Sequence, residues 1–445
     1  MASIVHRNNR FLVVHYEHDI SGKNKQKWET YRTLADAKRR KAEIEHRQEL
    51  GALDVPTCKT VNDLLKEYIS LYGKATWSLS VFSSNSRLIK NYISPIIGKM
   101  DLCEISPRIL EKYYQQLLKT PAVSHVTQKR GAKASSFVQP ATVRKIHSLL
   151  RSAFNQAVKW ELMEKNPAIH ATVPKAVPQK REVWDAETIF LALDVCDDAR
   201  LKLAINLSFA CSMRIGEILG LTWDSIDISP KSIAGGTASI MITKELQRVD
   251  KTAMKSLEQK DVLFIFPQSS KRNKTMLVLK KPKTESSIRK VFIPKTVAHQ
   301  LESWKREQER TKEALGDEYT DYNLVLAHGL GSPVEQSRIT AMFQALIKKN
   351  DLPRVVFHSL RHSSITYKLQ LTGGDIKSVQ GDSGHAQAQM VTDQYAHIMD
   401  KNRKNNAANP LNADFRVCAK CAILIKNSST AAGFYAHPDT LCPGA

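Results

Sequence analysis

The sequence lacks any apolar run long enough to cross a membrane as a helix, which takes about 20 residues. It is also poor in cysteine, since 7 cysteines scattered over 445 residues do not make a disulfide framework. The first segment, MASIVHRNNRFLVVHYEHD, is interrupted by charge too early to be a secretory signal. We therefore expect a cytoplasmic protein that does not enter a membrane.

Acidic residues are few compared with basic ones. Asp and Glu number 44 against 66 Lys and Arg, which gives a formal net charge of +22. A surplus of this size favours a polyanionic partner, with nucleic acid as the first candidate and an anionic membrane surface as the second. Because no amphipathic basic helix rich in Trp or Phe stands out, the sequence favours nucleic acid.

The chain is too long for one typical hydrophobic core, so we expect several domains. Composition and periodicity predict a small α+β domain at 1–57, an all-α bundle at 58–175, a mixed, mainly α-helical domain with a small antiparallel sheet at 176–410, and a tail at 411–445. The segment TVPKAVPQKREVW, rich in proline and basic residues, indicates a linker between the second and third domains.

The first two domains have clear local signals. FLVVHYEHD and KQKWETYRTL predict two strands, and Thr33 with Asp36 predicts a capped start for the basic helix that follows. This basic helix is either a solvated surface or part of a small DNA-binding domain. In the second domain, Thr60 predicts a helix N-cap, and an apolar stripe from Ile146 to Val158 indicates core packing.

The third domain shows mixed periodicity. Asp185 predicts a helix cap, and LKLAINLSFACS predicts a buried helix in which Cys211 is a core residue, as is Cys196 before it. TASIMITKELQRV and MLVLKKPKTESSIRKVFIP are typical of strands, with a long polar loop expected between them. Helices are predicted at about 295–314, 335–349, 359–370 and 386–396.

The stretch FHSLRHSSIT concentrates polar side chains of three kinds. His358, Arg361 and His362 stand at i, i+3 and i+4, so they share one face if the stretch is helical. Such a cluster suits a metal, a phosphate or a plain solvated surface. A metal is the weakest of these interpretations, because no carboxylate or third ligand flanks the histidines.

Other segments of the third domain carry single candidate residues. Arg214 lies at a tight turn before a short helix, where Glu217 could hold it; the alternative is a surface ion pair of little value. Lys283 lies near a hairpin turn, His385 follows a Ser-Gly pair, and Tyr395 lies ten residues further on. Taken singly, the lysine is typical of a solvated surface and the tyrosine of a helix core.

In combination and in this order, MRIGEILGL, HSLRHS and the Gly-His before Tyr395 resemble the tyrosine recombinase family, the phage integrase type. The resemblance covers the third domain. The second domain is similar to the family's helical core-binding domain, called SAM-like, and the first to the arm-type DNA-binding domain of integrases from phages and conjugative transposons.

The resemblance implies a site-specific recombinase, the integrase or excisionase of a mobile element, that cuts and rejoins DNA through a 3′-phosphotyrosyl intermediate. It implies Tyr395 as the nucleophile, His385 as a hydrogen-bond donor and Lys283 as the general acid, with Lys281 as an alternative acid. Arg214 and Arg361 would bind the nonbridging phosphate oxygens. His358 would accept the phenolic proton, and His362 would support the helix rather than the chemistry.

The resemblance also implies a tetramer on double-stranded DNA attachment sites, with a DNA-bending protein or excisionase as further partners, and no cofactor or metal. Two alternatives stay open, a type IB topoisomerase and a DNA-binding regulator without activity. Ser212 and Ser383 depart from the usual glycine and leucine. We expect the turn at Ser212 to be kept, but not a φ typical of glycine.

The tail contains a short cysteine motif, Cys418 and Cys421, spaced as CxxC. Only Cys442 could join them, so a zinc site would lack a clear fourth ligand. We expect a loosely packed tail without metal.

Overall fold

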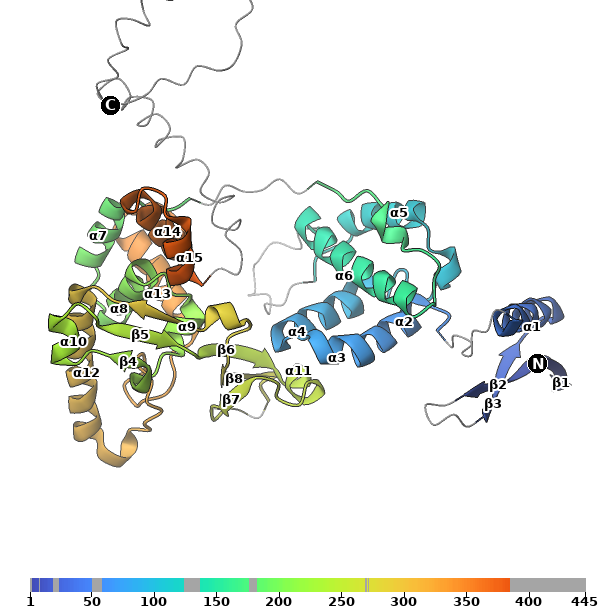
Figure 1. Ribbon diagram of the computed structural model, residues 1–445, viewed down its shortest axis with the longest axis horizontal. Helices are drawn as coiled ribbons and strands as arrows, with labels where there is room; N and C mark the ends of the chain where they lie inside the picture. Colours follow the sequence, from blue (N-terminus) through green and yellow to red (C-terminus); the bar gives the residue numbers. More distant parts are fainter. Residues whose placement is uncertain are drawn as a thin grey trace, which may run out of the picture. The chain divides into compact units, whose positions relative to one another are not determined.

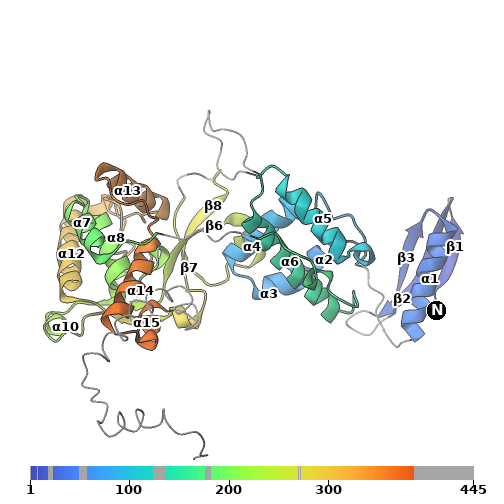
Figure 2. The same cartoon turned by 90° about the horizontal axis from the view of Figure 1, so that it is seen from above.

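The computed structural model describes residues 2–7, 9–18, 24–49, 58–123, 137–175, 182–268, 270 and 272–384. The chain forms two compact units (Figures 1 and 2). The first comprises the described residues of Met1–Gln179, Val249–Lys260 and Ser270–Met276, and the second comprises the others. The tail at 411–445, with its cysteines, lies outside the described residues.

The first unit begins with a three-stranded antiparallel sheet in the order β1-β2-β3. Its strands are β1 (Ser3–Arg7), β2 (Arg10–His18) and β3 (Asn24–Tyr31). Helix α1 (Leu34–Glu49) packs along one face (Figure 2), where Val13, Ala37 and Ile44 are buried together. Strands β2 and β3 and the cap of α1 confirm the predictions, whereas β1 was not predicted, because most of its short sequence is exposed.

The rest of the first unit is helical. Its core is the predicted stripe of α6, whose Ile146, Leu150 and Phe154 are fully buried. Thr60 caps the first helix, as predicted, through reciprocal hydrogen bonds with Asp63. The helices are α2 (Val61–Glu67), π-helix η1 (Tyr68–Gly73), α3 (Lys74–Thr76), α4 (Leu79–Leu88), π-helix η2 (Ile89–Ile93), 3₁₀-helix η3 (Leu102–Glu104), α5 (Pro107–Leu118), α6 (Pro140–Lys159) and 3₁₀-helix η4 (Pro167–Ile169).

The second unit is built around α8, a buried helix that α12 and α14 contact. Asp185 caps α7 and both predicted core cysteines are buried. Its helices are α7 (Ala186–Asp194), α8 (Ala199–Ala210), α9 (Ile215–Leu219), η5 (Trp223–Ser225), α10 (Pro230–Ala234), η6 (Glu285–Ser287), α12 (Lys295–Leu315), η7 (Gly316–Glu318), α13 (Gln336–Lys349), α14 (Ser359–Leu371) and α15 (Ile376–Ser383).

Among the described residues of this domain, two small sheets take the place of the single sheet that was expected. One has the order β4-β5-β9, with strands β4 (Ile226–Asp227), β5 (Ser239–Ile242) and β9 (Arg289–Phe292). The other has the order β6-β8-β7, with strands β6 (Glu245–Asp250), β8 (Thr275–Lys280) and β7 (Val262–Ile265). Each of the two predicted strand segments therefore divides between the sheets.

The prediction of a long polar loop between these two segments is wrong in part. This stretch contains α11 (Lys251–Ser256), which starts at Asp250, where the carboxylate accepts a hydrogen bond from the Thr252 backbone at 2.8 Å. Helix α11 belongs to the first unit and packs beside α4. The segment predicted as a loop also contains the short apolar strand β7. Both elements are too short to give a periodic signal within a polar stretch.

The predicted helices at 295–314, 335–349 and 359–370 are confirmed as α12, α13 and α14. The helix predicted at 386–396 lies outside the described residues, and the domain boundaries at 57/58 and 175/176 stay predictions. Among the described residues, no helix combines the length and the apolar character needed to cross a bilayer.

Candidate active site

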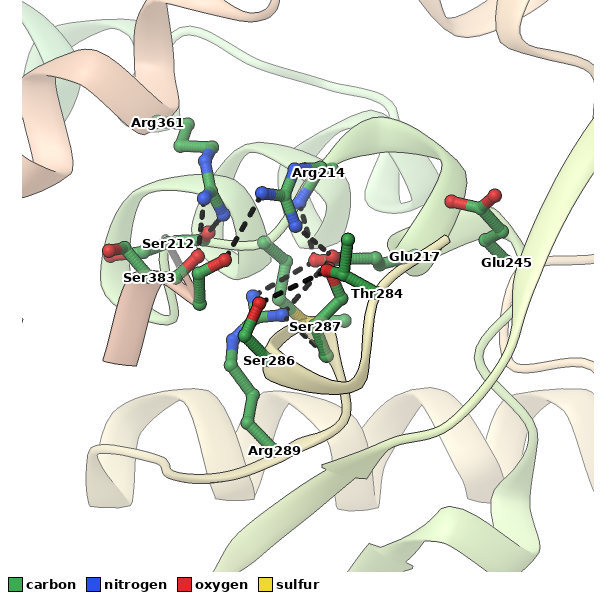
Figure 3. A network of polar contacts seen from close by, with 12 residues as sticks. Ser212, Arg214, Glu217, Glu245, Thr284, Ser286, Ser287, Arg289, Arg361 and Ser383 are labelled. Carbon is green, nitrogen blue, oxygen red and sulfur yellow. Dashed lines mark hydrogen bonds and ion pairs between the residues drawn. The ribbon is translucent and has the colours of Figure 1, made fainter. Parts of the chain in front are cut away.

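Several segments of the second unit meet around two arginine side chains (Figure 3). Arg361, in the first turn of α14, donates hydrogen bonds to the backbone carbonyls of Ser212 and Ser383. Arg214 donates from Nη2 to the carbonyl of Gly384 at 3.4 Å. Because Ser383 and Gly384 are neighbours, the two guanidinium groups lie together at the end of α15.

Arg214 is held firmly although its side chain is still one-third exposed (33%). It stands at the N-cap of α9, where the Glu217 carboxylate accepts hydrogen bonds from its backbone N–H at 2.9 Å and from its Nη1 at 2.7 Å. Ile218 and Leu221 are buried and anchor this helix. The arrangement fixes a partly exposed cation at a defined place, and it is not a surface ion pair, because the Glu217 side chain is only 1% exposed.

Glu217 is a buried carboxylate between two cations. Arg289, on β9, donates to it from Nη1 at 3.1 Å and from Nη2 at 3.0 Å. Burial by itself raises the pKa of the Glu217 carboxyl, but the hydrogen bonds and charge of Arg289, together with the charge of Arg214, outweigh burial and lower that pKa below its ordinary value. Glu217 is therefore ionised at neutral pH and keeps both arginines in place.

Arg361 is buried, with 2% of its surface exposed. Its guanidinium ties the turn before Arg214 to the end of α15 through the carbonyls of Ser212 and Ser383. A second link joins this turn to α14 itself, since the buried Ser212 and Ser364 hydroxyls are 2.6 Å apart. The three segments therefore form one connected unit.

The turn at Ser212 is kept, with a positive φ of 52°. This is the left-handed region that glycine adopts most readily, so the expectation that serine would avoid such a φ is wrong. The hydrogen bond between Ser212 and Ser364 gives a local reason, because it stabilises the serine where a glycine would have no side chain.

The histidines of the same helix have different surroundings. His358 is exposed at the N-cap of α14, while His362 is buried, and their rings meet edge to face with centroids 4.9 Å apart. His358 is therefore accessible from solvent, whereas His362 is part of the packing of α14. Within the described part of the chain, no three His, Cys, Asp or Glu side chains come together in a way that could bind a metal ion.

The candidate lysines lie on the turn between β8 and β9. Lys281 and Lys283 are both exposed there. Lys280, just before them, is buried, and its Nζ lies 2.8 Å from the Glu245 carboxylate. Lys283 precedes Thr284, whose hydroxyl is 2.9 Å from that of Ser287. The carbonyl of Ser287 accepts from Arg289, so this turn is connected to the arginine cluster.

Two predicted site residues, His385 and Tyr395, lie outside the described residues. The chain is described up to Gly384, the residue immediately before His385, where it caps α15 with a φ of 61°. Arg214 binds the carbonyl of this glycine, so the described chain leads to the arginine cluster at the point where His385 follows.

Sequence reasoning missed Arg289 and α15. The sequence did contain a signal for Arg289, because Ile288, Lys290 and Phe292 alternate with Arg289 and Val291 along a strand. In the structure the first three are exposed and the other two buried. An arginine in register with core residues of a strand indicates a buried partner, here Glu217.

Comparison with known proteins identifies related chains. Residues 265–402 match the phage integrase family, and residues 60–118 match the N-terminal SAM-like domain of phage integrases. The Tyrosine recombinase XerC-like protein of Caldanaerobacter subterraneus subsp. tengcongensis is 25% identical over 364 residues, covering 79% of this chain and 83% of that protein. The ICEBs1 integrase of Bacillus subtilis is 23% identical over 328 residues, covering 73% and 76%.

Solved structures show the same fold. The integrase of the transposon Tn1549, in complex with a circular intermediate DNA, superposes with a TM-score of 0.59 at 16% sequence identity, covering 79% of this chain and 99% of that one. The likeness supports a helix-rich, multidomain fold with small antiparallel sheets.

Proposed function

As a member of the phage integrase family of tyrosine recombinases, this chain is a site-specific recombinase of a mobile element, and we propose that the arginine cluster of its second unit binds the scissile phosphate of DNA. The observation that carries this proposal is the meeting of Arg214 and Arg361 at the adjacent carbonyls of Ser383 and Gly384. Two guanidinium groups at one place suit a group that gains negative charge during reaction.

In the proposed reaction, the phenolic oxygen of Tyr395 attacks phosphorus and the bond from phosphorus to the 5′ oxygen breaks. The phenolic proton passes to His358, and the leaving 5′ oxygen takes a proton from Lys283. The energy of the phosphodiester is kept in the 3′-phosphotyrosyl bond, so a 5′ hydroxyl of a second DNA end can reverse the steps and rejoin the strand without a nucleotide cofactor.

Each described residue contributes in a definite way. Arg214 is partly exposed and held by Glu217, so it can meet a phosphate oxygen without first being ordered. Arg361 is buried, and its charge is therefore weakly screened by water. His385 would add a further donor, because it directly follows the glycine that Arg214 binds.

The partners follow from the same proposal. We expect double-stranded attachment sites, four copies of the chain on two duplexes, and an accessory DNA-bending protein or excisionase. A formal net charge of +22 supports a DNA partner. We assign residues 1–57 to arm-type DNA binding and 58–175 to core binding.

Covalent trapping tests the proposal. DNA immediately flanking the gene is built into nicked duplexes that lose a short fragment on cleavage, so that the strand cannot be rejoined. Incubation without Mg²⁺ and a denaturing gel should show a protein–DNA adduct for the natural chain. Tyr395→Phe should bind the same duplex without forming an adduct.

Tyr319→Phe is the matched control. It removes a tyrosine hydroxyl that accepts a hydrogen bond from Gln308 in the second unit at 3.0 Å, so the adduct should form as in the natural chain. An adduct in Tyr395→Phe, or its loss in both variants, would contradict the assignment of the nucleophile.

A further inference from the structure

Arg289 is a buried cation next to the candidate site that the proposed reaction does not use directly. Its side chain is 6% exposed. Besides its two hydrogen bonds to Glu217 (Figure 3), it donates from Nη1 to the carbonyl of Ser287 at 3.0 Å. It also donates from Nε to the carbonyl of Asp382 at 2.8 Å. One guanidinium thus joins three segments that are far apart in the sequence.

Two of these contacts lead to residues of the proposed reaction. The Glu217 carboxylate holds Arg214 in place, because it accepts hydrogen bonds from both the backbone N–H and the side chain of Arg214. Asp382 lies two residues before Gly384, the residue whose carbonyl Arg214 binds. The Asp382 carboxylate also accepts a hydrogen bond from Lys368 of α14 at 2.6 Å. Arg289 therefore holds Arg214 from one side and the end of α15 from the other.

The packing around Gly384 shows how closely Arg289 fits this end of the helix. A Cβ added to Gly384 would lie 2.9 Å from Arg289 Cδ and 3.0 Å from Arg289 Nη1. The backbone that leads to His385 therefore rests directly against the Arg289 side chain. A shorter or differently shaped side chain at 289 would leave this backbone without support.

We propose that Arg289 is a positioning residue for strand cleavage, which fixes Arg214 through Glu217 and fixes the approach to His385 through the Asp382 carbonyl. This inference rests on the proposed function. Arg289 does not touch the phosphate in this scheme. It holds Arg214 through Glu217 and the end of α15 through the Asp382 carbonyl, so that Arg214 can direct its charge outward while Glu217 stays neutralised.

The physical consequence of losing Arg289 is specific. Glu217 would remain buried with Arg214 as its partner, and a buried carboxylate with less compensation draws its remaining cation inward. Lysine at 289 keeps the charge but cannot bind both carboxylate oxygens and the Asp382 carbonyl in the planar geometry of a guanidinium. We therefore expect a loss of cleavage rate even in a folded variant.

The experiment uses the full chain and the nicked duplex described above, with protein in excess over DNA. Arg289→Lys is compared with Arg40→Lys as a matched control. Arg40 is also buried and also binds a carboxylate with two nitrogens, Glu29, at 3.0 and 3.1 Å, but it lies in the first unit. We expect adduct formation to slow roughly 10- to 100-fold for Arg289→Lys and to stay near the natural rate for Arg40→Lys.

A second substrate separates positioning from loss of fold. A methylphosphonate at the cleaved position replaces a charged nonbridging oxygen with a methyl group, so the reaction depends less on a well-placed arginine. The rate on phosphate divided by the rate on methylphosphonate is independent of how much of the preparation is folded. We expect this ratio to fall at least about tenfold for Arg289→Lys and to be unchanged for Arg40→Lys.

The outcomes are distinguishable. If the natural chain forms no adduct, the proposed function fails and the inference fails with it. If the natural chain reacts and Arg289→Lys slows on both substrates equally, Arg289 serves only the fold. A rate for Arg289→Lys equal to that of the natural chain would likewise overturn the inference, whereas a lowered ratio supports it.

Discussion

Ser212 shows how a single residue can keep an unusual backbone conformation. A left-handed φ costs a residue with a side chain about 1–2 kcal/mol relative to glycine. At Ser212 this cost is opposed by the hydrogen bond to the Ser364 hydroxyl, in a place with no exposure to solvent for either side chain. The carbonyl of the same residue accepts from Arg361, so the conformation of Ser212 helps to place a candidate catalytic group.

Two variants of this pair give a prediction at the residue scale. Ser364→Ala leaves the Ser212 hydroxyl buried without its partner and should lower the free energy of unfolding by about 1–3 kcal/mol. Ser212→Gly combined with Ser364→Ala removes both hydroxyls and the backbone strain, so it should be more stable than Ser364→Ala alone. Calorimetric unfolding of the DNA-free protein measures both. A Ser364→Ala variant as stable as the natural chain would show that the hydroxyl pair contributes nothing.

At the scale of elements, the three-stranded sheet of the first unit has one face free of α1. On that face the register pairs Val14 with Trp28 and Tyr16 with Gln26. Trp28 is 51% exposed and Tyr16 is 55% exposed. Large exposed aromatic side chains on the helix-free face of a sheet are typical of an interaction surface, and a ribbon of strands fits the major groove of DNA. This supports a DNA-binding domain over a merely solvated basic helix.

This surface leads to a prediction about arm sites. Trp28→Ala with Tyr16→Ala should weaken binding to DNA repeats outside the core site about tenfold or more, since aromatic anchors carry much of an interface's energy. Cleavage of the core site should be unchanged. Electrophoretic mobility shifts on flanking and core duplexes measure both. Leu34→Ala, an exposed apolar residue on α1, is the control, and equal loss in the two variants would exclude the sheet face.

At the scale of the whole molecule, the net charge affects the affinity for DNA, whereas the site-specificity of strand cleavage does not follow from charge. A net charge of +22 supplies affinity for any DNA, but it carries no information about sequence. A type IB topoisomerase could share both the charge and the proposed cleavage chemistry. The two activities differ in whether strand cleavage requires a particular site.

Plasmid relaxation distinguishes these activities. We expect the full chain to relax a supercoiled plasmid that carries the gene-flanking site much faster than one that lacks it, because cleavage requires base-specific placement of the duplex. Agarose gels of both plasmids over time, at one salt concentration, measure this. Equal relaxation of the two plasmids would favour the topoisomerase alternative, and Tyr395→Phe serves as the inactive control.

Much of the architecture follows from local sequence. Thr60 and Asp185 cap their helices, the stripe of α6 forms a core, and the helices at 295–315, 336–349 and 359–371 begin and end close to their predicted limits. These features depend on periodicity and capping, which act over a few residues. The spacing of Arg214, His358 and Arg361 likewise needs no tertiary structure to be recognised.

Tertiary structure decided what holds those residues. Arg289 lies 72 positions from Glu217 and 93 from Asp382, so no local pattern could show that one guanidinium joins them. It also decided that β5 and β6, and likewise β8 and β9, enter different sheets, because strand partners are chosen by long-range pairing. The sequence by itself determined which chemical groups this protein has; only the folded chain brings Arg214, Arg361 and the end of α15 together, because their contacts are between distant segments.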